Sequence, residues 1–167
     1  FFLDTDLKPW RGRLTGDSGE VSNFFNKTHG YNEFIIHYAN LVKDYADAFI
    51  IGSELIGLTK IKDSSNNFPA VNELVRLAEI VKTIVGERVL VSYAADWSEY
   101  HHTEGGWYNL DPLWASPNID FIGIDAYFPV TNLDGSYITN KDIKEGFSSG
   151  EGYDYYIDHE RNEKFPL

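Results

Sequence analysis

The sequence predicts an α/β fold and, within that class, a partial (β/α)8 TIM barrel made of its central βα units only. Amphipathic helical segments alternate with short β-rich strands, which is the order expected around a parallel sheet. No G-x-G-x-x-G turn follows an early strand, although a doubly wound nucleotide-binding sheet would favour one. Polar residues follow each of the three clear strands, as they do at the functional end of a barrel.

The first part of the chain contains one predicted helix and one predicted strand. Residues 1–30 are rich in turn formers and are expected to be irregular, apart from a candidate strand near Phe1–Leu3. The run 48–52, AFIIG, is typical of a strand that is buried on both sides. A polar loop is predicted at 59–68. Residues 31–45 have a helical period, since one face collects Tyr31, Phe34, Ile35, Tyr38, Leu41, Val42 and Tyr45.

A second helix and two further strands are predicted after this loop. Pro69 opens the helix and Gly86 ends it. Buried strands are predicted at 88–94 and 119–127, separated by a long aromatic loop. Beyond them the pattern weakens, and 146–157 is predicted to be a loop with some helix. The side chains of the second helix that are expected to point inward are Leu74, Leu77, Ala78, Val81 and Val85.

Three clear strands are too few to close a barrel, because a complete barrel has eight strands and about 250 residues. We therefore expect residues 1–167 to be a single domain that is a fragment of a longer protein. An open sheet leaves two unpaired strand edges and an exposed apolar face. The chain is expected to cover them with its own termini or by self-association.

The composition is that of a globular protein with an acidic surface. Hydrophobic residues make up 43% and aromatic residues 16% of the 167, and the net charge is −12. Nucleic acid is not an expected partner, because a phosphate backbone is bound by Lys and Arg. The same charge disfavours an anionic membrane surface, and neither a membrane span nor a signal peptide is visible. An uncharged substrate fits this surface better than a polyanion does.

Three carboxylates stand at the ends of the predicted strands and would converge on one rim. They are Glu54, Asp96 and Asp125, and Tyr93, Trp97 and Tyr127 accompany them. Two carboxylates beside a cleft suit glycoside hydrolysis, in which one donates a proton and the other acts as nucleophile or base. Aromatic rings offer apolar faces to sugar C–H groups. The competing interpretation is structural, because an acid at a strand end can cap a helix or pair with an arginine, and loop aromatics can simply pack.

Other chemistries have weaker signals in the sequence. His101, His102 and Glu104 lack the spacing of a metal site, so no metal is expected. Ser53 lacks the G-x-S-x-G elbow of a serine hydrolase. Cysteine is absent, which excludes thiolate chemistry. No cofactor is expected.

Several segments resemble the TIM-barrel-like domain of gene transfer agents and of phage tail (baseplate or tail-hub) proteins. The likeness runs over nearly the whole chain and lies in PWRGRLTG, FIIGSELIGLT, FPAVNELVRLA, VSYAADWSEY, DPLWASPNIDFIGIDAYFP and GEGYDYY. That family is similar to the retaining glycosidases built on (β/α)8 barrels. The resemblance implies that this chain supplies about strands 3–6 of such a barrel.

The resemblance also implies roles for particular residues. In those glycosidases the acid/base glutamate ends strand 4 and the nucleophile glutamate ends strand 7, which gives Glu54 the acid/base place and puts the nucleophile beyond Leu167. Ser53 stands where those enzymes usually have asparagine, and it can still donate a hydrogen bond to a sugar hydroxyl. The glutamates that follow no buried strand, and are not expected to replace the nucleophile, are Glu99, Glu104, Glu145 and Glu151.

The resemblance leaves the function open between two main hypotheses. In the first, the chain is a structural module of a tail hub or baseplate that either binds cell-envelope glycan weakly or only packs against other tail proteins, in a phage-like particle assembled in the bacterial cytoplasm. Alternatively, the full-length parent is an active retaining glycosidase that trims cell-envelope glycan. A cytoplasmic sugar-binding domain is a third hypothesis. We favour the first, because a particle component can keep a fold after losing its chemistry.

Overall fold

We describe a computed structural model of the chain. It forms two compact units, Phe1–Asp125 and Ala126–Leu167, and each is described by itself. The prediction of a single domain over 1–167 stays a prediction. The residues that the structure describes are 2–3, 10–127, 137–148, 155–158 and 163–166.

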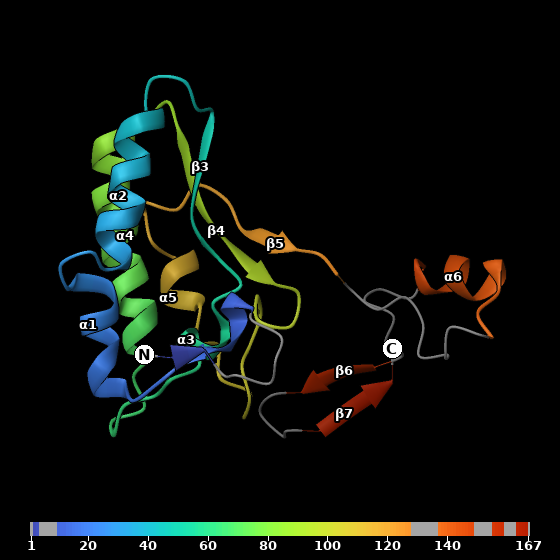
Figure 1. Ribbon diagram of the computed structural model, residues 1–167. Helices are drawn as coiled ribbons and strands as arrows, with labels where there is room; N and C mark the ends of the chain where they lie inside the picture. Colours follow the sequence, from blue (N-terminus) through green and yellow to red (C-terminus); the bar gives the residue numbers. More distant parts are fainter. Residues whose placement is uncertain (1, 4–9, 128–136, 149–154, 159–162, 167) are drawn as a thin grey trace. The chain divides into compact units, whose positions relative to one another are not determined.

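A three-stranded parallel sheet is the centre of the first unit (Figure 1). Its strands are β3 (Ala48–Ser53), β4 (Leu90–Asp96) and β5 (Gly123–Asp125), in that order. The sheet confirms the predicted α/β class and the partial TIM-barrel-like architecture. Because parallel strands end at a common edge, the last residues of all three strands lie at the same end of the sheet, where Asp96 pairs with Asp125.

Helices cover one face of this sheet. In Figure 1, α1 (Val21–Asn26), α2 (Tyr31–Val42) and α4 (Pro69–Val85) lie on the same side of β3 and β4. The second predicted helix is confirmed as α4, which begins at Pro69 and ends before Gly86. Gly86 has a φ of 74°, a left-handed conformation that glycine adopts without a steric cost. All five inward positions predicted for α4 are buried.

The hydrophobic core lies between these helices and the sheet. Leu74, Leu77 and Val81 of α4 pack in one cluster with Ile51 of β3 and Val91 of β4, and all five are fully or almost fully buried. Burying one such side chain stabilises the fold by about 1.5–3 kcal/mol. This cluster is therefore what holds the strands, and hence the strand ends, in place.

The opposite face of the sheet is open along β3 and β5, so the prediction that residues 48–52 are buried on both sides is wrong. The prediction of a buried strand at 88–94 is confirmed for most of β4, where Ser92 on this second face is fully buried. Side chains alternate along a strand, and while Ile51 is fully buried, Ile50 is 39% exposed and Leu90 46% exposed. Ile122 and Ile124, at and before β5, are exposed as well. In a closed barrel this face would point inward, and three strands alone cannot curve round to cover it.

The predicted first helix is confirmed as α2, but its apolar face is mostly not buried. Asn32, Ile35 and Ala39 face the core, and Phe34 is 57% exposed and Leu41 56% exposed. Ala39 is small enough to bring α2 close to its neighbours, and the side-chain amide of Asn32 donates to Asn26 Oδ1 at the end of α1. These contacts rotate the helix away from the orientation that hydrophobicity alone predicts.

The N-terminal segment is more ordered than predicted. The expectation of an irregular 1–30 is wrong, since η1 (Arg11–Arg13), β2 (Leu14–Thr15), η2 (Ser18–Glu20) and α1 lie within it. The strand expected near Phe1–Leu3 is β1 (Phe2–Leu3), which pairs antiparallel with β2 and does not join the parallel sheet.

A glycine lets this N-terminal segment approach the sheet end. A Cβ on Gly57, in α3 (Ile56–Thr59), would lie 2.3 Å from the Leu14 carbonyl oxygen. Only glycine therefore permits this contact between α3 and the segment around η1. The approach is what brings Trp10 and Arg11 to the end of β3.

The third predicted strand is shorter than expected. Residues 119–127 contain only β5. The Asp120 N–H donates to the Val91 carbonyl as in a strand, but the Val91 N–H donates to the Asp120 side chain and not to a backbone carbonyl. Asp120 Oδ2 accepts from the Val91 N–H at 2.6 Å and from Lys82 Nζ at 2.8 Å. The predicted loop before this strand also contains a short helix, α5 (Asp111–Trp114).

The second unit holds α6 (Asn140–Gly146) and an antiparallel hairpin of β6 (Tyr155–Asp158) and β7 (Glu163–Pro166). The loop predicted for 146–157 is wrong where β6 begins. The sequence signal for α6 is its capping box, in which Thr139 Oγ1 accepts from the Asp142 N–H and Asp142 accepts in return from the Thr139 N–H. None of the helices in the described parts of the chain is long and apolar enough to cross a bilayer.

Candidate functional site

The turn after β3 sets the position of Glu54. Glu54 has a φ of 50°, in the left-handed region, which costs a residue with a side chain about 1–2 kcal/mol. Two hydrogen bonds to β4 hold this conformation. The Glu54 N–H donates to the Ala94 carbonyl at 2.8 Å, and the Leu55 N–H donates to the Tyr93 hydroxyl at 2.7 Å.

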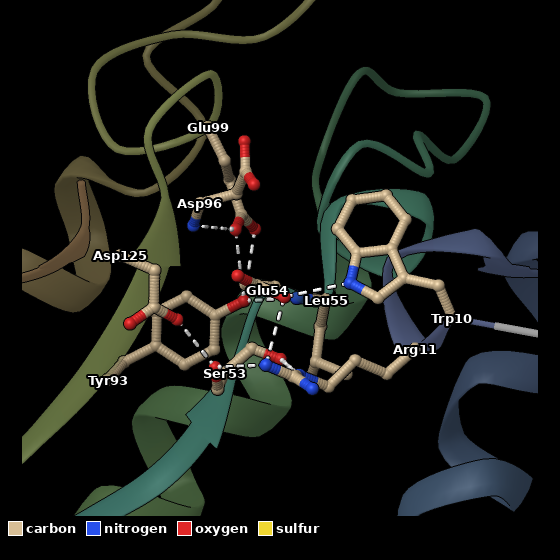
Figure 2. Close-up of polar contacts among 9 residues, drawn as sticks. All are labelled: Trp10, Arg11, Ser53, Glu54, Leu55, Tyr93, Asp96, Glu99 and Asp125. Atoms are coloured by element: carbon tan, nitrogen blue, oxygen red, sulfur yellow. Dashed lines mark hydrogen bonds and ion pairs between the residues drawn. The ribbon is translucent and has the colours of Figure 1, made fainter. Parts of the chain in front are cut away.

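Two N-terminal side chains hold the Glu54 carboxylate (Figure 2). Trp10 Nε1 donates to Glu54 Oε2 at 2.8 Å, and Arg11 Nη2 forms an ion pair with the same oxygen at 2.9 Å. The Glu54 side chain is only 8% exposed, whereas that of Arg11 is 50% exposed. The carboxylate is therefore shielded by its partners, and the guanidinium forms the accessible part of the cluster.

Arg11 connects Glu54 to a second carboxylate. Its Nε donates to the Ser53 carbonyl at 2.9 Å and its Nη2 to Ser53 Oγ at 3.0 Å. Ser53 Oγ in turn donates to Asp125 Oδ2 at 2.8 Å. The two carboxylates are thus connected through Arg11 Nη2 and Ser53 Oγ. We call Trp10, Arg11, Ser53, Glu54 and Asp125 the rim cluster.

A buried polar group lies behind the rim cluster. The Tyr93 hydroxyl donates to the Glu99 carboxylate, whose oxygens lie 3.1 and 3.2 Å away. Glu99 also accepts from Thr59 Oγ1 at 2.5 Å and from the Asp96 N–H at 3.2 Å. Tyr93 and Thr59 are fully buried and Glu99 is 2% exposed.

Burial dominates the ionisation of this group. It raises the pKa of Glu99 from 4.5 to about 7, although hydrogen bonds from Thr59, Asp96 and Tyr93 act in the opposite direction. Burial and the neighbouring Glu99 charge raise the pKa of Tyr93 well above its usual value. Tyr93 therefore stays a hydroxyl and a donor at any ordinary pH, while Glu99 changes charge near neutrality.

The structure brings some of the predicted site residues together and separates others. Ser53, Glu54 and Asp125 meet in the rim cluster. Tyr93 supports it from the buried side. Asp96 Oδ1 accepts from the Ser98 N–H at 2.8 Å and from Ser98 Oγ at 2.6 Å, so this acid caps its own turn, as in the structural interpretation.

The two predicted aromatic residues of the rim are placed differently. Trp97 follows β4 directly and is partly exposed, and it is not among the residues of the rim cluster. Tyr127 belongs to the second unit and is 74% exposed. That either ring binds a sugar stays a prediction.

Sequence reasoning missed three residues of this region. Trp10 and Arg11 lie in the segment that was expected to be irregular, and Glu99 was set aside because it follows no strand directly. The proximity of Arg11 to Arg13 in an acidic chain was the available signal for the first two. For Glu99 the signal is its place three residues after Asp96, where its N–H closes a turn onto the Asp96 carbonyl at 2.8 Å.

The described residues contain no group of three or more His, Cys, Asp or Glu side chains arranged to hold a metal ion. His101 and His102 do approach each other, with their Nδ1 atoms 3.1 Å apart. Two imidazoles without a further ligand are not a structural zinc site.

Comparison with known proteins identifies the family. No curated protein and no solved structure matches the chain significantly. The family described as "GTA TIM-barrel-like domain" matches residues 29–165, which is most of the chain and includes the whole parallel sheet. This agrees with the partial barrel seen in the first unit. The chain therefore belongs to the family of gene transfer agent TIM-barrel-like domains.

Proposed function

We propose that the chain is a structural module of the tail hub or baseplate of a phage-like particle, and that its rim cluster binds a cell-envelope glycan. Gene transfer agents are phage-like particles, and membership of their TIM-barrel-like family supports that setting. The particle would be assembled in the bacterial cytoplasm and contact other tail proteins. The glycan would be its ligand at the cell surface.

The chemistry of the rim cluster supports recognition of a sugar. The half-exposed Arg11 guanidinium and the partly exposed Ser53 and Asp125 offer donors and acceptors to vicinal hydroxyl groups, and Trp10 is 37% exposed beside them. The chain has a net charge of −12, which favours a neutral glycan over an acidic one.

One observation favours binding over hydrolysis. Glu54 Oε2 accepts hydrogen bonds from both Trp10 and Arg11. A general acid must present a proton to the leaving oxygen. While Oε2 accepts from an indole and a guanidinium, only Oε1 could carry that proton, and the ion pair with Arg11 favours the charged carboxylate over the acid. In this arrangement Glu54 orients Arg11 and acts as an acceptor.

The test is a binding titration with oligosaccharides released from bacterial envelopes and separated into neutral and acidic pools. We expect the neutral pool to bind, and Arg11→Ala to weaken binding at least about tenfold, since hydrogen bonds to a charged group contribute about 1.5–3 kcal/mol. Arg88→Ala is the matched control, because Arg88 is similarly exposed but precedes β4 at the other end of the sheet. Equal losses in both variants, or no binding by either pool, would rule the proposal out.

The second candidate is glycoside hydrolysis by the full-length parent, with Glu54 as acid/base and a nucleophile beyond Leu167. The observation in its favour is the second carboxylate, Asp125, which is connected to Glu54 through Ser53 and Arg11, since a glycosidase uses two carboxylates. It requires Arg11 to release Glu54 when substrate binds. The test is hydrolysis of glycan by the full-length parent. Loss of product in Glu54→Gln, with unchanged product in Arg88→Ala, would support this candidate over the first.

A further inference from the structure

Glu99 joins the end of α3 to the middle and the end of β4 through one buried carboxylate. Thr59 is the last residue of α3, Asp96 ends β4, and Tyr93 projects its hydroxyl from the middle of β4. A buried polar group with all its partners in place is rigid, and it becomes costly when one partner is removed. Glu99 is thus placed to fix the relative positions of these segments.

Tyr93 extends this group to the Glu54 turn. Its hydroxyl has one proton, which it donates to Glu99, and the oxygen accepts the Leu55 N–H at 2.7 Å. The direction of the proton leaves a lone pair facing Leu55. Without an acceptor at Glu99 the hydroxyl would be free to turn, and its hold on the Leu55 N–H would weaken.

The Glu54 turn needs such a hold because its backbone is strained. A left-handed φ at a residue with a side chain persists only when the surrounding structure fixes it. The Leu55 N–H immediately follows Glu54, so a change there rotates the Glu54 side chain relative to its partners. Trp10 Nε1 reports that rotation directly, because it donates to Glu54 Oε2 at 2.8 Å.

We propose that Glu99 is a positioning residue for Glu54: acting through Tyr93, it fixes the left-handed turn that presents the Glu54 carboxylate to Trp10 and Arg11. The role is independent of what the rim cluster binds. It concerns the geometry of the cluster in the unliganded protein.

The surroundings of Glu99 allow its role to be tested by changing the pH, because they determine where its carboxyl group ionises. Tyr93 and Asp96 face it from β4 and Thr59 from α3, and the Asp96 charge adds to the effect of burial on Glu99. Burial raises the pKa of Glu99 to about 7, while that of Tyr93 lies well above its usual value. Glu99 is therefore expected to titrate near neutral pH.

The experiment follows the indole N–H resonance of Trp10 by NMR as pH is raised, with the resonance assigned by Trp10→Phe. In the wild-type chain we expect it to shift with a midpoint of about 7. In Glu99→Gln, which keeps a carbonyl acceptor but cannot ionise, this titration disappears. In Tyr93→Phe the resonance moves at all pH values and the titration is lost, because the connection to Leu55 is broken.

Thr59→Val is the matched control. It removes one hydrogen bond from Glu99 and leaves the connection through Tyr93, so the titration should remain and its midpoint should rise. The amide resonance of Val81, in the middle of α4, reports whether each variant is folded. If the Trp10 resonance shows no titration near neutral pH in the wild type, or is unchanged in folded Tyr93→Phe, the proposal is overturned.

Discussion

The buried carboxylate of Glu99 predicts a specific dependence of stability on pH. Its pKa is raised from 4.5 to about 7 in the folded chain, with burial as the main cause. The folded state therefore binds a proton more tightly than the unfolded state, and stability is lost as pH rises from about 4.5 to about 7. A tenfold change in proton affinity is about 1.4 kcal/mol, so the full loss is about 3 kcal/mol.

Glu99→Gln isolates this contribution because every other ionisable group is common to both proteins. Urea unfolding, followed by tryptophan fluorescence at several pH values, gives the free energy of unfolding of each. The wild type should lose about 3 kcal/mol relative to the variant across this range, and the difference should be constant at higher pH. A difference that does not change with pH would refute the reasoning. A change of the opposite sign would show that the hydrogen bonds to Glu99 outweigh its burial.

Three further predictions concern the rest of the first unit. Lys82→Met should lower the free energy of unfolding by about 1–3 kcal/mol, because the Asp120 carboxylate, which is 24% exposed, loses its charge-assisted hydrogen bond. Urea unfolding measures this loss, and Lys82→Met combined with Asp120→Asn should recover part of it. A loss below about 0.5 kcal/mol would mean that the pair contributes little. Gly57→Ala should displace the N-terminal segment, because the new Cβ would lie 2.3 Å from the Leu14 carbonyl oxygen. The NMR resonance of the Trp10 indole N–H should then move toward that of a free indole. An unchanged resonance would contradict this packing. The chain should self-associate through its exposed apolar side chains, one of which is Phe34 on α2. Phe34→Ser should therefore shift the mass measured by light scattering toward that of the monomer. A wild-type chain that is monomeric at every concentration would contradict this prediction.

The sequence is informative about the βα units because their signals are local. Pro69 and Gly86 bound α4, and its apolar period predicts each buried side chain. The strand ends follow from the same patterns, which is why Glu54 and Asp125 are predicted to share a rim. Where a side chain replaces a backbone partner, as Asp120 does beside Val91, a strand pattern overestimates the length of the strand.

The rest of the candidate site depends on contacts between distant parts of the chain. Trp10 and Arg11 reach Glu54 across more than 40 residues, and the approach relies on Gly57, a single glycine whose role no local pattern reveals. The role of Glu99 likewise follows from Thr59 and Tyr93, which lie on two other elements. Hydrophobic periodicity does not predict such partners, because these contacts are hydrogen bonds and ion pairs between polar side chains.

The central claim, that the rim cluster is a glycan-binding surface, is tested most directly by mapping a bound sugar onto the chain. Titration of the isotopically labelled protein with the neutral envelope oligosaccharides would be followed by NMR. We expect saturable shifts of the Trp10 indole N–H and of the Ser53 and Asp125 amides, with those around Arg88 unchanged. Saturable shifts confined to other surfaces, or none at any concentration of the neutral pool, would contradict the claim.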